Sequence, residues 1–128
     1  MPPWESYKAE AKARGSLALE LFVVQSSPSA SPDEMKANLP AHLEYQSQME
    51  REGTLVLAGP MSDESGEQMQ GMGLIVYRAA SFEAARAIAD ADPMHMSGAR
   101  SYVLRKWLVN EGGFTLSVGL SGQSVRLE

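Results

Sequence analysis

The order of strand-like and helix-like segments is the feature that most restricts the fold of this chain. Four short segments have the apolar runs or alternation of β-strands, and two longer segments have the start and stop signals of helices. Before its last residue, Gln25, the first strand has only Glu20 as a polar residue, so both faces are largely apolar, as in a sheet that is covered on both sides. The predicted strands span residues 17–25, 54–58, 73–79 and 101–109, and the predicted helices span 31–52 and 81–91.

The resulting β-α-β-β-α-β order predicts an α+β protein with the ferredoxin-like arrangement, in which both helices cover one face of a four-stranded antiparallel sheet. The opposite face then stays uncovered, although several strands place apolar side chains on it. An exposed apolar face of this kind usually marks an interface. We therefore expect a homodimer in which the open sheet faces of two copies pack against each other.

Local signals set the expected ends of the first long helix. Residues 31–34 form a capping box with a proline in the first turn, which indicates a helix start, and Gly53 is suited to end the same helix. Pro40 lies inside this segment. It is expected to kink the helix or to restart it.

Glycine and proline also predict where the other segments end. Gly59 and Pro60 are expected to end the second strand, and a mobile polar loop is expected at residues 61–71. The residue before a proline avoids the helical region, so Asp92 should end the second helix sharply. A tight loop at residues 94–98 should follow.

The chain extends beyond this core pattern on both sides. We expect residues 1–16 to form an N-terminal helical extension, 17–111 the ferredoxin-like domain, and 112–128 an additional strand with a loose tail after Gly122. The extra helix and strand are expected to contribute to the dimer interface or to cover an edge of the sheet.

Composition excludes several classes of function. The 128 residues carry a net charge of −5, which argues against nucleic acid as a partner, and they contain no cysteine for disulfides or thiolate chemistry. No apolar run approaches the ~20 residues that cross a bilayer, and the first residues lack the apolar core of a signal peptide. We therefore expect a cytoplasmic protein without a membrane partner.

One histidine and one aspartate lie where apolar residues would be expected. On a helical wheel His42 projects between Leu39 and Met49, on the inward face of the first helix, and Asp92 projects between Ala85 and Ile88 at the end of the second. A buried titratable group needs a partner. If the two side chains meet, the carboxylate would fix the imidazole tautomer and leave the second ring nitrogen to accept a substrate proton.

Structural roles compete with this hypothesis. A single inward histidine is often a core residue with satisfied hydrogen bonds, and an aspartate before proline often caps backbone amides. His95 offers a second acid–base group or, together with His42 and Asp92, a metal site of two histidines and one carboxylate. The spacing matches no compact metal motif, and we expect no metal. Candidate substrate contacts on the segments that should flank the pair are Gly59, Pro60, Met94, His95, Ser97 and Arg100.

Five short motifs resemble the YCII-related (YciI-like) family. They are Ala41-His42-Leu43, Glu52-Gly53-Thr54-Leu55, Ala58-Gly59-Pro60-Met61, Ser81-Phe82-Glu83-Ala84-Ala85 and Ala91-Asp92-Pro93-Met94. The resemblance covers about residues 17–111. It implies a dimeric α+β barrel related to muconolactone isomerases, and a His–Asp active site that falls on His42 and Asp92. One characterised branch of the family is a dehydrochlorinase acting on a chlorinated hydroxyquinol.

Three functions are compatible with these residues. The first is a small cofactor-independent enzyme, a lyase or isomerase, in which His42 transfers a proton to or from a small cyclic or aromatic metabolite and Asp92 orients it. The second is a non-catalytic protein that binds a small molecule in the same pocket. The third is a haem-dependent barrel with His42 as the axial ligand, which the pairing with Asp92 disfavours.

Overall fold

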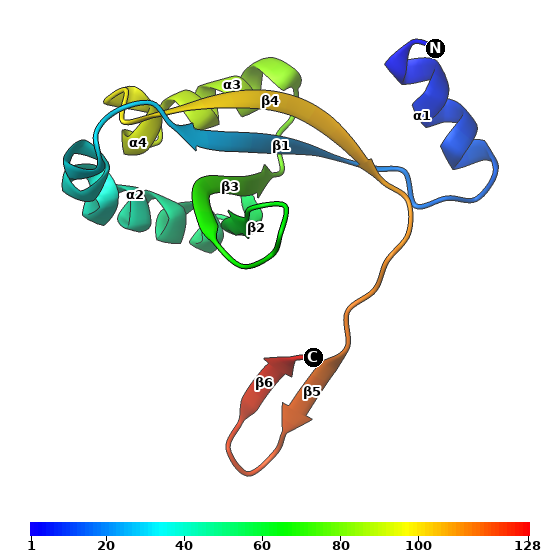
Figure 1. The fold of residues 1–128 in the computed structure, drawn as a ribbon. Coiled ribbons are helices and arrows are strands. Elements are labelled where there is room, and N and C mark those ends of the chain that lie inside the picture. Colours follow the sequence, from blue (N-terminus) through cyan, green and yellow to red (C-terminus); the bar gives the residue numbers. More distant parts are fainter. The chain divides into compact units, whose positions relative to one another are not determined.

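The computed structural model describes residues 1–128, which divide into two compact units. Residues Glu20–Trp107 form the larger unit, and residues Met1–Leu19 with Leu108–Glu128 form the smaller one. The elements drawn in Figure 1 are α1 (Trp4–Ala13), β1 (Leu19–Pro28), α2 (Pro32–Arg51), β2 (Leu55–Ser62), β3 (Met69–Tyr77), α3 (Phe82–Asp90), α4 (Pro93–Met96), β4 (Arg100–Val109), β5 (Leu116–Gly119) and β6 (Ser124–Leu127).

The larger unit contains a four-stranded antiparallel sheet with the order β2-β3-β1-β4. The two central strands pair in antiparallel register, with Phe22 opposite Tyr77 and Val24 opposite Ile75. These positions alternate with residues that face the other side of the sheet. The element order and the strand order confirm the predicted ferredoxin-like α+β fold.

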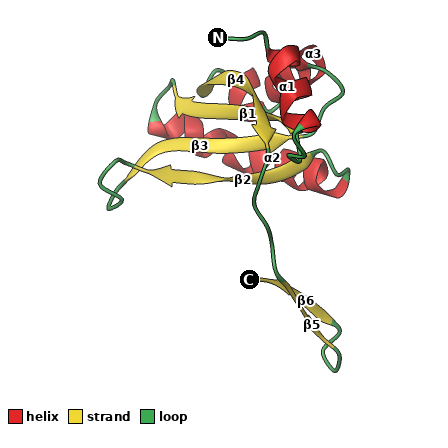
Figure 2. Cartoon of the chain, turned by 90° about the vertical axis from the view of Figure 1, so that its right-hand side faces the viewer, coloured by secondary structure: helices red, strands yellow, loops and turns green.

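The helices α2 and α3 lie on one face of this sheet, and Figure 2 shows α2 running behind the strands. The core between them combines the aromatic rings of Phe22 and Tyr77 with Met49 of α2 and with Ala85 and Ala89 of α3. The two alanines are fully buried, so α3 meets the sheet with its smallest side chains and can approach it closely. No helix is both long enough and apolar enough to cross a bilayer.

The other face of the sheet carries apolar side chains that nothing in the larger unit covers. Leu104 is buried on the helix side, so its neighbour Val103 and the later Trp107 point to the opposite side, where they are 52% and 46% exposed. Leu57, opposite the outward Val76, is 48% exposed. These three side chains make part of the face apolar and exposed, whereas Leu21 and Val76 on the same side of the sheet are each only 4% exposed.

α2 is one continuous helix, and the restart that was considered at Pro40 does not occur. Its N-terminus has the predicted cap, since Ser31 Oγ accepts a hydrogen bond from the Glu34 amide at 3.2 Å. Gly53 ends the helix with a φ of 77°, a conformation that glycine adopts without strain. Pro40 is exposed, and the helix tolerates it there because a carbonyl left without its amide donor on the solvent side can bind water.

The β2–β3 hairpin corrects two expectations. Gly59 and Pro60 lie inside β2 rather than at its end, because β2 is an edge strand and a proline there removes no hydrogen bond that the sheet needs. The polar segment expected as a mobile loop at residues 61–71 is shorter than predicted, because β2 continues to Ser62 and β3 begins at Met69. Only residues 63–68 turn the chain, and Asp63 Oδ1 accepts hydrogen bonds from the amides of Ser65 and Gly66, both at 3.1 Å.

Two further segments are more regular than expected. The predicted loop after Asp92 contains the single helical turn α4, which begins at Pro93 as an N-capped helix commonly does. In the smaller unit the tail after Gly122 is not loose but forms β6. It pairs with β5 through Leu116 opposite Leu127 and Val118 opposite Val125, cross-strand pairs that stabilise a hairpin.

Side chains from α2 and α4 complete the hydrogen bonds at the C-terminus of α3. The last carbonyls of a helix lack amide donors from the next turn. Tyr45 of α2 donates its hydroxyl to the Ile88 carbonyl at 2.6 Å, and His95 Nδ1 lies 2.8 Å from the Ala89 carbonyl. Both contacts hold the end of α3 in place just before Asp92.

We expect Pro40→Ala to raise the free energy of unfolding by about 1 kcal/mol or more, because alanine restores an amide donor inside a continuous helix and has a higher helix propensity. Chemical denaturation of the purified variant measures the change. Ala41→Gly at the adjacent exposed position is the matched control, and it should lower the free energy by about 1 kcal/mol. Equal or reduced stability of Pro40→Ala would contradict this account of the helix.

Alkaline unfolding tests the environment of Tyr45. Burial first, and then the charges of Asp92 and Glu52, raise the pKa of Tyr45 to about 12 from 10.0. The folded state therefore favours the neutral phenol. Its stabilising contribution is fully present below pH 10.0 and is lost as the pH rises through about 12.

In Tyr45→Phe no phenol titrates at this position. We expect its free energy of unfolding to fall less steeply than that of the wild type between these two pH values, as measured by denaturant titrations across the range. At neutral pH the variant should lose about 1 kcal/mol, because the Ile88 carbonyl loses its donor. Parallel pH profiles for the two proteins would show that Tyr45 does not titrate as described.

Candidate functional site

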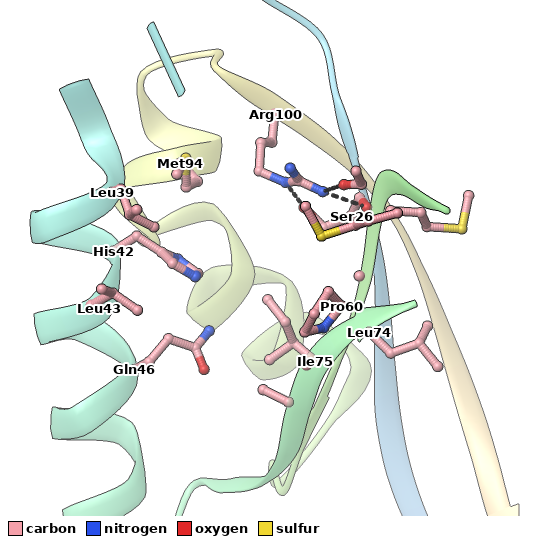
Figure 3. Close-up of a pocket in the computed structure, with 16 residues that line it drawn as sticks. Ser26, Leu39, His42, Leu43, Gln46, Pro60, Leu74, Ile75, Met94 and Arg100 are labelled. Carbon is pink, nitrogen blue, oxygen red and sulfur yellow. Dashed lines mark hydrogen bonds between the residues drawn. The ribbon is translucent and has the colours of Figure 1, made fainter. Parts of the chain in front are cut away.

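His42 and Asp92 meet, as the helical-wheel argument anticipated. His42 Nδ1 lies 2.9 Å from both carboxylate oxygens of Asp92. The Asp92 side chain is completely buried, whereas the His42 side chain is 19% exposed. The imidazole therefore stands between a buried carboxylate and an accessible space, the cavity drawn in Figure 3.

Local sequence explains why Asp92 is placed so firmly. It is the N-cap of α4, and the proline that follows holds its backbone in the extended region, with φ −62° and ψ 126°. One carboxylate oxygen accepts a hydrogen bond from the Met94 amide at 2.9 Å. Asp92 is thus both a helix cap and the hydrogen-bond partner of His42.

The contact fixes how the imidazole carries its proton. A carboxylate only accepts hydrogen bonds, so Nδ1 carries the hydrogen and donates it to Asp92. The lone pair of the neutral ring then resides on Nε2, which forms no hydrogen bond within the protein. This is the arrangement of an imidazole prepared to accept a proton.

The charge of Asp92 acts on several neighbours. Burial and, next, Asp92 raise the pKa of Tyr77, whose buried hydroxyl has no hydrogen-bond partner. Burial lowers the pKa of the Arg100 guanidinium, and the Asp92 charge opposes that shift. The space between α2 and the sheet therefore has the low polarity in which charged groups act strongly on one another.

A cavity of about 420 Å³ opens beside His42 between α2 and the strands. Its walls are mainly apolar. The polar or charged side chains among its lining residues come from Ser26, His42, Gln46 and Arg100. The apolar and glycine positions are Leu39, Leu43, Ala58, Gly59, Pro60, Met69, Gly71, Met72, Gly73, Leu74, Ile75 and Met94.

A second polar cluster lies on the sheet side of the cavity. Arg100 Nε donates to Ser26 Oγ at 2.8 Å, and its Nη2 donates to the carbonyls of Ser26, at 2.8 Å, and Gly71. Ser26 Oγ also lies 2.9 Å from His95 Nε2. Because His95 Nδ1 donates to the Ala89 carbonyl, Nε2 of the neutral ring accepts the hydrogen of the Ser26 hydroxyl.

The candidate substrate contacts separate into two groups. Gly59, Pro60, Met94 and Arg100 line the cavity. His95 and Ser97 do not: His95 lies behind Ser26, and Ser97 Oγ interacts with the backbone of its own turn. Both ring nitrogens of His95 have partners inside the protein, and His42, Asp92 and His95 do not form a metal-binding group.

Sequence reasoning missed two polar residues of the cavity. Ser26 lies just beyond the strand predicted at residues 17–25, but β1 continues to Pro28 and places Ser26 on the same face as Phe22 and Val24. The sequence signal for this was that Ser26 continues the alternation of Phe22 and Val24, which indicates a polar side chain on the inward face of the strand. Gln46 lies one helical turn after His42 on the inward face of α2, and its amide nitrogen is buried without a partner.

The fold has a known structural counterpart. It resembles the solved structure of 5-chloro-2-hydroxyhydroquinone dehydrochlorinase (TftG) from Burkholderia phenoliruptrix AC1100 in complex with 2,5-dihydroxybenzoquinone. The TM-score is 0.52 and the sequences are 18% identical, over 68% of this chain and 92% of that one. No curated protein matches the chain.

The sequence profile of the YCII-related domain matches residues 19–108. This range contains His42 and Asp92 and all the residues that line the cavity. The chain therefore belongs to the YCII-related domain family.

Proposed function

We propose that this protein is a small cofactor-independent enzyme in which His42 is the general base and acid and Asp92 is its orienting partner. The reaction is proton abstraction coupled to elimination or isomerisation of a small cyclic or aromatic metabolite. The observation that carries the proposal is the His42–Asp92 contact of 2.9 Å, with the other imidazole nitrogen left for the cavity.

The dimensions and walls of the cavity support a small cyclic substrate. Its volume of about 420 Å³ lies within the range of small-molecule sites, where most of the ligand surface is buried. Leu39, Leu43 and Ile75 offer apolar surface to the faces of a ring, and only a few polar groups are available to orient it.

The structural counterpart supports the reaction class. TftG is a dehydrochlorinase of a hydroxylated aromatic ring and is seen with a quinone. An elimination of that kind needs a base that removes a proton and a site that holds a flat ring. The pair and the cavity described above would supply both, and a dehydrochlorination or a related isomerisation is the class we assign.

Variants of His42 and Asp92 test this function. We expect His42→Ala to slow turnover by about 10²–10⁴-fold while retaining ligand affinity, because the variant loses proton transfer and keeps the cavity walls. Asp92→Asn should also slow turnover, since an amide can present its NH₂ group to Nδ1 and favour the wrong tautomer. The measurement is mass spectrometry, which follows loss of HCl from chlorinated hydroxyquinols, and product formation or solvent deuterium exchange into the C–H bonds of phenols and lactones.

Glu44→Gln, an exposed substitution on the same helix, is the matched control and should behave as the wild type. Retained binding without exchange by the wild-type protein across the whole panel would favour a non-catalytic binding protein. Exchange that persists in His42→Ala at the wild-type rate would remove His42 from the chemistry.

We also propose that two copies form a dimer through the open sheet face. The support is the exposure of Leu57, Val103 and Trp107 on one side of a sheet whose other side is covered by helices. A face of this composition is expected to be buried in a two-fold dimer.

We expect Val103→Asp to weaken the dimer by about 100-fold or more, because it places an unpaired charge in an apolar interface. Sedimentation equilibrium measures the change, and Trp107→Ser should act in the same direction. Glu50→Lys, on the exposed side of α2, serves as the control and should leave the association constant unchanged. A wild-type protein that sediments as a monomer at all concentrations would rule out this interface.

A further inference from the structure

The Arg100 guanidinium is a cation without a carboxylate partner at the edge of the cavity. Its contacts are Ser26 Oγ and the carbonyls of Ser26 and Gly71, all of them uncharged. The one remaining neighbour is the sulfur of Met35, 3.7 Å from Nη1. A thioether is a weak acceptor, so the donor capacity of Nη1 is largely unused.

The surroundings hold this cation in one position. A chain of hydrogen bonds leads from Arg100 to the backbone of α3. Arg100 Nε–H donates to Ser26 Oγ, and the Ser26 hydroxyl donates to His95 Nε2. His95 Nδ1–H in turn donates to the Ala89 carbonyl. The His95 ring also packs against Tyr102, with 4.7 Å between ring centroids. The guanidinium is therefore oriented before any ligand arrives, which reduces the entropy lost on binding.

The carboxylate of Asp92 lies near the cavity but does not contact Arg100. Asp92 is occupied by His42 and by the Met94 amide. The remaining lining of the cavity is mainly apolar, as the labelled side chains in Figure 3 illustrate. A cation of this kind in a low-polarity site favours an anionic ligand, and a guanidinium with a free donor suits an ionised oxygen.

We infer that Arg100 anchors an ionised oxygen of the ligand, with Ser26 and His95 as its positioning residues, so that the substrate is a small ring anion and not a neutral ring. The ionised oxygen belongs to a phenolate or enolate, or to a ring carboxylate. The inference rests on the proposed function only for the reacting end of the ligand, which faces His42. The end of the ligand that binds Arg100 depends only on Arg100 and its contacts.

Binding measurements with matched probes test the anchor. 2,5-Dihydroxybenzoquinone and benzoate carry ionised oxygens at neutral pH, and 2,5-dimethoxybenzoquinone presents a quinone ring without a charge. By isothermal calorimetry we expect the wild type to prefer at least one anionic probe over the uncharged ring by about tenfold or more. The two anionic probes distinguish a phenolate-type ligand from a carboxylate.

In Arg100→Gln this preference should disappear, with the affinity for the uncharged ring changed by less than about twofold. Arg100→Lys should retain part of it, because the charge remains and the planar fork is lost. Ser26→Ala and His95→Gln should reduce the ratio of anionic to neutral affinity, a ratio that a purely structural defect would leave unchanged. Arg105→Gln, at an exposed arginine of the same strand, is the control.

Three results would overturn the inference. The first is a wild-type protein that binds neither anionic probe at millimolar concentration, or that binds anionic and neutral probes equally well. The second is an Arg100→Gln variant that still prefers the anionic probes. The third is a folded Arg100→Gln variant that loses affinity equally for all probes. If Arg100→Gln does not fold, Arg100→Lys and Ser26→Ala decide by the same ratio. The proposed reaction is judged separately, because His42→Ala should lose deuterium exchange and keep the preference for anions.

Discussion

The buried carboxylate of Asp92 is the constraint on which the site depends. A carboxylate without access to water is unfavourable unless hydrogen bonds and a partner compensate for its lost hydration. Here the compensation comes from the Met94 amide at the start of α4 and from His42 on α2, each at 2.9 Å. The Asp92 side chain thus joins α2, which follows β1, to α4, which precedes β4. Its removal would leave a helix without its cap as well as an imidazole without its orienting partner. Stability and the proposed chemistry would therefore be coupled at this residue.

The cavity separates two polar systems of opposite character. On the helix side, a carboxylate fixes an imidazole whose free nitrogen accepts hydrogen bonds. On the sheet side, a neutral imidazole and a serine fix a guanidinium that can only donate. Each system has a first group that lines the cavity, His42 or Arg100, and a group behind it that does not line the cavity, Asp92 or His95. A ligand between them meets an acceptor on one wall and a cation on the other, and this asymmetry would fix its orientation in a way that the apolar walls alone would not.

The sequence allowed the fold and half of the site to be predicted, for reasons that can be stated residue by residue. His42 and Asp92 were visible because each is a polar residue on an apolar helical face, and a helix has a regular period. Ser26 was not visible in the same way, since the end of β1 depends on pairing with Gly73 of β3, which lies far along the chain. The pairing of β6 with β5 was missed, and the choice between a kink and a restart at Pro40 stayed open, for a related reason. Local propensity identifies breaks in a segment, whereas tertiary and cross-strand contacts decide whether a break occurs.

Glycines lie where the β2–β3 hairpin lines the cavity. A Cβ at Gly73 would lie 3.3 Å from the Gly59 carbonyl oxygen, so the two strands could not keep their present spacing with larger residues there. Gly71 has a φ of 88°, and a Cβ on it would lie 2.8 Å from Cγ of Pro28. The intervening Met72 and the nearby Met69 both line the cavity. The backbone of the β2–β3 hairpin therefore forms part of the wall directly, and flexible methionine side chains supply the rest, a combination that lets the wall adjust to a ring while the two polar systems stay fixed.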